Sequence, residues 1–200
     1  MNIIKLPSMN IVKYDSVSST NIAARNWLDQ DVPLFTPLVF VARKQTQGKG
    51  QQGNWFSPED CGIYMSVIRP MYKPKPGCSC CGDGNFTDVE LIMEMIVNKV
   101  RWAMSDVLCL DLTTRPSSPN RPRPGNDIYL NNRKVAGILC EYHANTDKLI
   151  IGIGINTFRP AKVRKDLLQK AVWLNEYSAE HLISHDILVE KVAEGILSLS

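Results

Sequence analysis

The amino-acid sequence predicts an α+β fold built on a mixed, largely antiparallel sheet, with helices packed mainly on one face. Three observations support this prediction. Strand-like segments outnumber helical ones, two strands can be joined by a tight hairpin, and strands do not alternate regularly with helices as in a parallel α/β fold. The chain has 200 residues, of which 44% are hydrophobic and 22% charged, as expected for one globular domain with a substantial core.

The strands follow from short apolar or alternating runs bounded by polar turns. Asn131 and Asn132 both tolerate positive φ, so they predict a tight hairpin between two of these runs. In the last run, glycines alternate with isoleucines, which opens one face of that strand to close approach of a ligand or another backbone. The predicted strands cover residues 10–15, 38–44, 62–69, 127–130, 133–142 and 149–156.

Three helices are expected. The first follows a turn at residues 16–21 that is rich in N-cap residues, and it extends to about Leu28. The second begins at a capping box, residues 87–90, and the third lies near the C-terminal end. Their apolar stripes are predicted core positions: Val89, Ile92, Ile96, Val100, Ala103 and Val107 in the second helix, and Leu188, Val192, Ile196 and Leu199 in the third.

Two segments lack apolar periodicity. Residues 71–86 are rich in proline, glycine and cysteine and residues 113–125 are rich in proline, so both are predicted as surface loops. Residues 113–134 contain five basic side chains and one acid, Asp127, a local charge of +4. This charge favours an anionic ligand or an acidic partner, although a solvated basic loop explains it equally well.

Composition excludes several classes of protein. The net charge of +3 is too small for a nucleic-acid-binding surface, which needs a strongly basic stripe. No apolar run approaches the length of a membrane span, and residues 1–13 lack a secretory pattern. The expected location is therefore the cytoplasm, with no membrane or nucleic-acid partner.

The six cysteines divide into two groups. Cys61, Cys109 and Cys140 stand apart in apolar surroundings and are expected to be small buried residues. Cys78, Cys80 and Cys81 form a cluster with one C-x-x-C spacing, which suits zinc or a redox pair. Because a second such pair and a nearby histidine are both missing, no metal site is predicted.

A glycine-rich loop at residues 45–55 is the most informative segment. Its three glycines let the backbone wrap around a ligand, and its N–H groups could hold a phosphate or carboxylate. The spacing is neither that of a Walker loop nor that of a dinucleotide fingerprint. By itself the loop could also be a plain tight connection.

Polar clusters stand at the ends of four predicted strands, and Lys134 adds a cation within a fifth. Each has a simpler explanation, such as a helix cap, a turn or a strand end. Together they are more informative. The clusters are Ser19-Thr20-Asn21, the loop at residues 45–55, Arg123-Pro124-Gly125-Asn126-Asp127 and Asn156.

In this order the clusters resemble the motifs of the catalytic domain of biotin protein ligases, over residues 15–156. Five motifs in sequence make the resemblance specific. They are Ser19-Thr20-Asn21, then Gly48-Lys49-Gly50-Gln51-Gln52-Gly53 with Trp55, Ser57 and Pro58, then Arg123-Pro124-Gly125-Asn126-Asp127-Ile128-Tyr129, then Arg133-Lys134-Val135-Ala136-Gly137-Ile138-Leu139 followed by Glu141, and Gly152-Ile153-Gly154-Ile155-Asn156.

The resemblance implies a reaction in two steps. The carboxylate of biotin attacks the α-phosphate of ATP, with Mg²⁺, to give biotinyl-5'-AMP and pyrophosphate. A lysine of a biotin carboxyl carrier domain then attacks the mixed anhydride. The transition state gathers negative charge, so fixed cations and hydrogen-bond donors are required.

The resemblance also assigns roles to matched positions. Arg123, Lys49 and Gln51 are the expected catalytic residues. The expected biotin-binding residues are Ser19, Thr20, Asn21, Gln45, Lys49, Gly50, Gln51 and Arg123. The expected nucleotide-binding residues are Trp55, Asn126, Asp127, Lys134 and Asn156.

The sequence departs from the family at two places. The family loop carries arginines at the positions of Lys49, Gln51 and Gln52, and a lysine at the position of Arg123. Lysine lacks the bidentate fork of arginine, and glutamine lacks its charge. Three expectations remain open: a slow ligase, compensation by Arg115 or Arg121, or a relative that binds biotin without reacting.

Three further expectations concern an alternative function, the domain organisation and the oligomeric state. A lipoate or octanoate ligase or transferase is the closest alternative, and a transferase of that kind would use a cysteine such as Cys140 as a thioester. Residues 1–200 are expected to form a single catalytic domain, without an N-terminal DNA-binding domain or a C-terminal SH3-like domain. A homodimer is also compatible with the resemblance.

Overall fold

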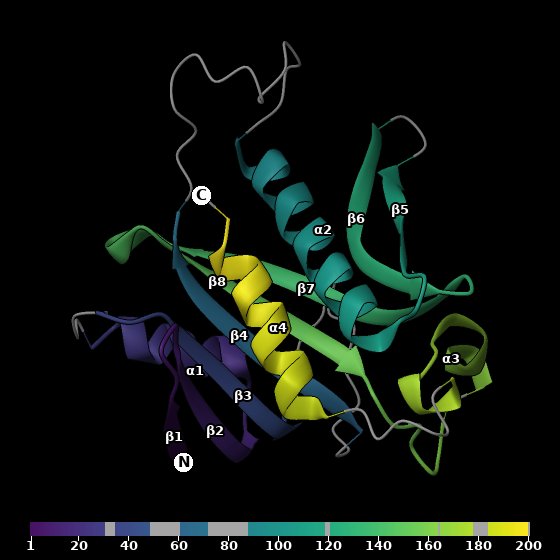
Figure 1. The fold of residues 1–200 in the computed structure, drawn as a ribbon, viewed down its shortest axis with the longest axis horizontal. Coiled ribbons are helices and arrows are strands. Elements are labelled where there is room, and N and C mark those ends of the chain that lie inside the picture. The colour runs from purple at the N-terminus through teal and green to yellow at the C-terminus, as the bar shows by residue number, and fades with distance from the viewer. Residues whose placement is uncertain are drawn as a thin grey trace.

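A computed structural model describes residues 1–30, 35–48, 61–71, 88–118, 121–163, 165–177 and 184–199. Within these ranges the chain forms an eight-stranded sheet with the spatial order β1-β2-β3-β4-β8-β7-β6-β5 (Figure 1). Only β2 and β3 run parallel, while the other neighbouring pairs of described strands are antiparallel. The predicted mixed, largely antiparallel sheet is confirmed.

The strand bounds agree with the sequence prediction at most positions. The four strands of the first half are β1 (Asn2–Lys5), β2 (Asn10–Val17), β3 (Leu38–Gln45) and β4 (Gly62–Pro70). The four strands of the second half are β5 (Thr113–Ser118), β6 (Arg121–Leu130), β7 (Arg133–His143) and β8 (Lys148–Asn156). Strand β1 was not predicted, since a run of four residues at an edge carries little pattern.

Helices cover the two faces of the sheet unequally. Helices α2 (Asp88–Leu108) and α4 (His185–Leu197) pack against each other over one face, and α1 (Thr20–Leu28) packs on the opposite face (Figure 1). A short helix, α3 (Lys165–Lys170), follows the last strand. Helices are thus concentrated on the predicted single face, with α1 as the exception.

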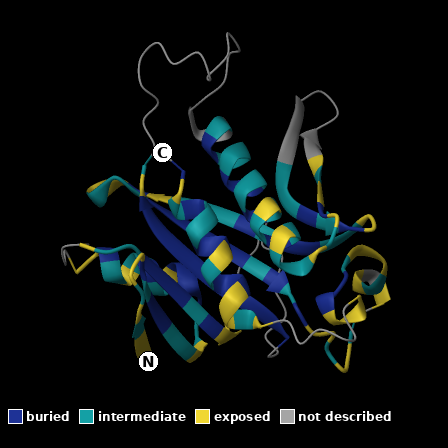
Figure 2. Cartoon of the chain, viewed as in Figure 1, coloured by how far each residue is buried: buried dark blue, intermediate teal, exposed yellow. Residues whose placement is uncertain are grey.

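The alternation along each central strand explains this arrangement. Ile151 and Ile153 of β8 point into the core beneath α2 and α4, whereas Ile150 packs with Ala24 and Leu28 of α1. Figure 2 shows that β4 and β8 are buried along most of their length, as is the first half of β3. Since α1 is short, it covers only part of its face, and the neighbouring part remains available for a site.

The predicted helical stripes are confirmed where they are described. In α2, Ile92, Ile96 and Val100 are buried, and Ala103 and Val107 pack against the same core. In α4, Leu188, Val192 and Ile196 are buried, and Leu199 is buried just beyond the helix. The side chain of Val89 and the first residue of the predicted capping box lie outside the description.

The hairpin prediction is also confirmed. Asn131 and Asn132 connect β6 to β7 with φ values of 48° and 65°, the left-handed conformations of a type I′ turn. Asparagine accepts this region more readily than most residues do. The turn fixes the register of β7 immediately before Lys134.

The prediction of a loop at residues 113–125 is wrong. This segment forms β5 and the first half of β6, which pair with register shifts near Pro116. Prolines are tolerated on edge strands and at bulges because those positions need fewer backbone N–H donors. Strand β5 is the last strand of the sheet and contains one proline, Pro116. The prolines of β5 and β6 obscured the sequence signal for strands without preventing their pairing.

Candidate ligand-binding site

A cavity of about 160 Å³ lies on the sheet face that carries α1. Gly137, Gly152 and Gly154 line it from β7 and β8, so this part of the sheet presents backbone without side chains. The remaining lining side chains are mainly polar. Of the predicted site residues, the cavity brings together Ser19, Thr20, Asn21, Gln45, Asn126 and Lys134.

The first residues of α1 form one end of the cavity. Ser19 is the N-cap residue by position, but its side chain makes no capping hydrogen bond. Thr20 and Asn21 are 3% and 6% exposed. The Thr20 N–H donates to Oε1 of Gln45 at 2.7 Å, and its hydroxyl lies 3.2 Å from the same oxygen. Gln45, at the end of β3, is thereby fixed against the start of α1.

Ser66 of β4 joins these residues, and the sequence analysis missed it. Its hydroxyl is fully buried and lies 2.7 Å from Thr20 Oγ1 and 2.6 Å from Asn21 Oδ1. A polar residue inside an otherwise apolar strand was the available signal. Ser66 therefore connects the sheet to the first two residues of α1.

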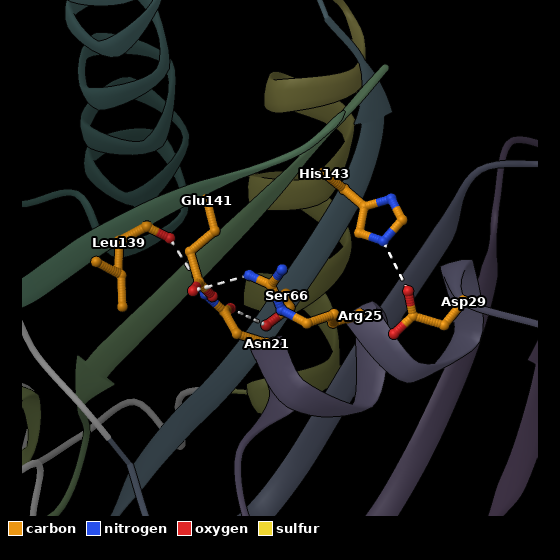
Figure 3. Close-up of polar contacts among 7 residues, drawn as sticks. All are labelled: Asn21, Arg25, Asp29, Ser66, Leu139, Glu141 and His143. Carbon is orange, nitrogen blue, oxygen red and sulfur yellow. Dashed lines mark hydrogen bonds and ion pairs between the residues drawn. The ribbon is translucent and has the colours of Figure 1, made fainter. Parts of the chain in front are cut away.

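Glu141 of β7 completes the network (Figure 3). Its carboxylate accepts from Asn21 Nδ2 at 2.7 Å and from Arg25 at 3.0 Å. Asn21, Arg25 and Asp29 follow one another at intervals of four, so they lie on one stripe of the α1 region. Asp29 in turn contacts the buried His143 of β7 at 2.9 Å. These contacts attach α1 to alternate residues of one strand.

The close approach of α1 depends on Gly152. A Cβ atom at residue 152 would collide with the carboxamide of Asn21, with Cγ only 2.9 Å away. The glycine face predicted from the sequence of β8 is thus used by a side chain of α1. This packing places the polar start of the helix directly over the bare part of the sheet.

Lys134 marks the other end of the cavity. Its Nζ atom lies 2.6 Å from Asp127 Oδ1, and both side chains are about one-third exposed or less. Asn126 lines the cavity and donates from Nδ2 to the Ile138 carbonyl at 2.8 Å. This end offers a cation whose present partner is a single carboxylate.

Asn156 and Asp127 are not among the residues that line the cavity. Asn156 Nδ2 donates to the carbonyls of Lys134 and Val172, at 3.3 and 3.2 Å. The N–H of Val172 also donates to the Lys134 carbonyl. Asn156 therefore holds the backbone of Lys134 in place.

Tyr129 and Arg115 lie next to this cationic end. The guanidinium of Arg115 is 4.2 Å from the centre of the Tyr129 ring and donates to the Asn132 carbonyl at 2.6 Å. Burial and the neighbouring Asp127 raise the pKa of Tyr129, while Arg115 opposes the rise. Arg115 is not among the lining residues, so nothing in this arrangement assigns it the compensating role.

Several predicted site residues lie outside the description. They are Lys49, Gly50, Gln51 and Trp55 in the glycine-rich loop and the side chain of Arg123 in β6. Gln47, at the start of the same loop, lines the cavity. The loop therefore leaves the sheet at the cavity, although its further course is not described.

The cysteines differ from the sequence prediction in one case. Cys61 is buried as expected, but Cys109 is exposed after the end of α2. Cys140 is partly buried and packs against the core beneath α2 and α4, on the sheet face opposite the cavity. Burial raises the pKa of the Cys140 thiol to about 12, with a further contribution from Glu141. Position and protonation both argue against Cys140 as a nucleophile.

The described residues contain no cluster of three or more potential metal ligands. The predicted cluster of Cys78, Cys80 and Cys81 lies outside the description. A second hollow of about 590 Å³ lies beside the start of α4. It is larger than the first but contains none of the predicted site residues, so the smaller, polar cavity is the better candidate.

The fold and cavity define a class of protein: an α+β domain with a small polar cavity between a helix start and the glycine face of a mixed sheet. The sequence model of the Biotin/lipoate A/B protein ligase family matches residues 15–156, which include every described residue of the cavity. The chain belongs to this family.

Three proteins illustrate what the chain is similar to. The "Bifunctional ligase/repressor BirA" of Salmonella typhimurium is 26% identical over 192 residues, covering 94% of this chain and 52% of that protein. The biotin protein ligase of Leishmania major in complex with biotin superposes with a TM-score of 0.69 at 24% identity, covering 96% of this chain and 74% of that one. The biotin protein ligase of Aquifex aeolicus in complex with biotin and ATP gives 0.66 at 21% identity, covering 93% and 69%.

The chain spans about half the length of the curated relatives it matches. The structural similarities lie below 25% identity and establish the fold. Among the described helices, none combines the length and apolar character needed to cross a membrane.

Proposed function

We propose that this protein is an ATP-dependent biotin–protein ligase, which forms biotinyl-5'-AMP and transfers biotin to a lysine of a carrier domain. The observation that carries the proposal is the cavity with two chemically different ends. Amide and hydroxyl groups of Thr20 and Gln45 line one end, Lys134 lines the other, and glycines form the floor between them. The family membership and the relatives named as ligases support the same activity.

The α1 end suits the ureido ring of biotin. A cyclic urea offers one carbonyl acceptor and two N–H donors, so it needs several fixed polar partners. Ser19, Thr20 and Gln45 present such groups from positions that are mostly buried. The lost hydrogen bonds would make a ligand without these groups bind more weakly.

The Lys134 end suits the carboxylate of biotin and the phosphates of ATP. Formation of the adenylate brings two anions together, and a positioned ammonium lowers the cost of that encounter. The phosphates would compete with Asp127 for Lys134, since they too are anionic and Asp127 already holds the ammonium at 2.6 Å. We assign Asn126 and Asp127 to the same region.

The residues outside the description complete the proposal. Lys49, Gly50 and Gln51 would wrap the carboxylate and phosphate, Trp55 would stack on adenine, and Arg123 would neutralise the adenylate. The described residues provide one carboxylate, Asp127, at the phosphate end, and it is paired with Lys134. This does not form a protein-built Mg²⁺ site, so Mg²⁺ would enter as part of the Mg·ATP substrate.

The first partial reaction tests the proposal. Exchange of labelled pyrophosphate into ATP should depend on biotin, because only the reversible adenylation of biotin returns the label to ATP. Lipoate and octanoate in place of biotin are the controls. Exchange that depends on lipoate but not on biotin would overturn the assignment in favour of lipoate ligation. A protein that binds biotin without any exchange would be a non-catalytic relative.

A further inference from the structure

Glu141 is the starting point of a hydrogen-bonded chain that ends at the proposed biotin contacts. The chain runs from Glu141 to Asn21, then to Ser66 and Thr20, with steps of 2.7, 2.6 and 2.7 Å. Ser66 is fully buried, and Asn21 and Thr20 are nearly so. Few alternative partners therefore exist for these groups.

The direction of each bond in this chain follows from Glu141. A carboxylate only accepts hydrogen bonds, and Arg25 holds Glu141 as a charged partner at 3.0 Å. Asn21 must consequently turn its NH₂ group to Glu141 and its Oδ1 atom to Ser66. Ser66 has one proton, and it is used on Asn21 Oδ1.

The consequence reaches the ligand. The hydroxyl proton of Ser66 is already donated to Asn21 Oδ1. Thr20 must therefore donate its own hydroxyl proton, either to Ser66 Oγ at 2.7 Å or to Gln45 Oε1 at 3.2 Å. In both cases the Thr20 hydroxyl presents only lone pairs to the cavity. Resting on the proposed function, we infer that Glu141 is a positioning residue that makes Thr20 an acceptor for a ureido N–H of biotin.

Substitution Glu141→Gln tests this role while keeping the shape of the side chain. A glutamine can keep its oxygen on Arg25 and offer its NH₂ group to Asn21, which would reverse every bond of the chain. Biotin affinity should fall on the order of tenfold, the effect of one weakened hydrogen bond. Glu194→Gln is the matched control, since Glu194 forms an exposed pair with Lys191 on α4 and should leave affinity unchanged.

A double-mutant cycle with Ser66→Ala distinguishes two roles of Glu141: orienting the hydrogen bonds through Ser66, or anchoring α1 through Arg25. If Glu141 acts through Ser66, Glu141→Gln should cost about tenfold alone but little in the Ser66→Ala background. If Glu141 only anchors α1 through Arg25, the two losses should multiply, and that result would overturn the inference. Calorimetry with biotin gives the affinities.

A ligand-free measurement distinguishes failure of this inference from failure of the proposed function. In the wild type, an NH₂ proton of Asn21 should resonate downfield because of its bond to a carboxylate, and Glu141→Gln should remove that shift. Ser66→Ala should retain the downfield shift of Asn21, because the bond to Glu141 remains. This second variant provides a test even if Glu141→Gln folds poorly. An unchanged Asn21 signal in Glu141→Gln contradicts the chain direction. A wild type that shows the shift but binds no biotin contradicts the proposed function and supports the chain direction.

Discussion

At the scale of single residues, the site depends on the absence of a side chain as much as on those present. Gly152 lets the Asn21 carboxamide rest on the backbone of β8, and Gly137 leaves room for Lys134, whose Nζ would be 2.9 Å from a Cβ atom at that position. Both ends of the cavity thus use a glycine of the sheet. This explains the function of glycines in strands, where they otherwise weaken pairing.

Substitution Gly152→Ala should weaken biotin binding by more than tenfold, because the new methyl group would push Asn21 and the start of α1 away from the sheet. Isothermal calorimetry measures the loss. Gly195→Ala is the matched control: a Cβ atom in α4 would meet its nearest neighbour at 3.5 Å, so binding should be retained. Equal affinity in both variants would show that Asn21 does not need this close approach.

Substitution Lys134→Met should reduce adenylate formation on the order of a hundredfold, the effect of removing one electrostatic contact to the transition state. Biotin binding should change little. The variant also leaves Asp127 unpaired beside the phosphates, so adding Asp127→Asn should restore part of the rate. Pyrophosphate exchange measures the effect, and Lys191→Met is the control. Full activity of Lys134→Met would remove this cation from the mechanism.

Cys140 should be nearly inert to iodoacetamide at pH 8 in the folded protein. With a pKa of about 12, roughly one thiol in ten thousand is ionised at that pH, and only the thiolate reacts. The exposed Cys109 should react readily and provides the internal control. Peptide mapping identifies the labelled sites. Rapid labelling of Cys140 would reopen the thioester alternative.

The residues of the site were predictable to different degrees. Ser19, Thr20, Asn21, Gln45 and Lys134 could be predicted because they stand in motifs. Ser66 could not, since one serine in an apolar strand does not reveal which partners it meets across the sheet. Glu141, whose carboxylate accepts a hydrogen bond from Asn21, was recognisable only as a motif position. Its contacts depend on how α1 packs.

At the scale of elements, the turn between β6 and β7 influences which residues of β7 face the cavity. The turn sets the register of β7, and β7 supplies Lys134, Gly137 and Glu141 to the cavity.

Residues 113–125 show why the prediction of elements failed there. Pairing between neighbouring strands outweighed the local effect of proline, as tertiary context often does for β-propensity.

Substitution Asn132→Ala should lower the free energy of unfolding by about 1 kcal/mol, because alanine is disfavoured at positive φ. Asn132→Gly should be neutral or stabilising, since glycine adopts this conformation without strain. Urea denaturation measures both. A loss of stability in Asn132→Gly as large as in Asn132→Ala would mean that the asparagine side chain, and not its backbone conformation, stabilises the turn.

At the scale of the whole molecule, the two faces of the sheet have different roles: one packs against the larger core cluster and the other carries the cavity. Helices α2 and α4 cover one face over the larger core cluster, whereas α1 lies on the other face (Figure 1). The cavity lies beside the first turn of α1. Fold class was predictable because it depends on patterns repeated over many residues. The placement of α1 was not, because a nine-residue helix packs according to tertiary contacts.

The most direct test of the proposed function is the complete reaction. The protein is incubated with biotin, Mg·ATP and an apo biotin carboxyl carrier domain, and the intact mass of the carrier is measured, with omission of ATP as the control. We predict the addition of one biotinyl group to the carrier lysine, only when ATP is present. An unmodified carrier, or one modified by lipoate and not by biotin, would contradict the account.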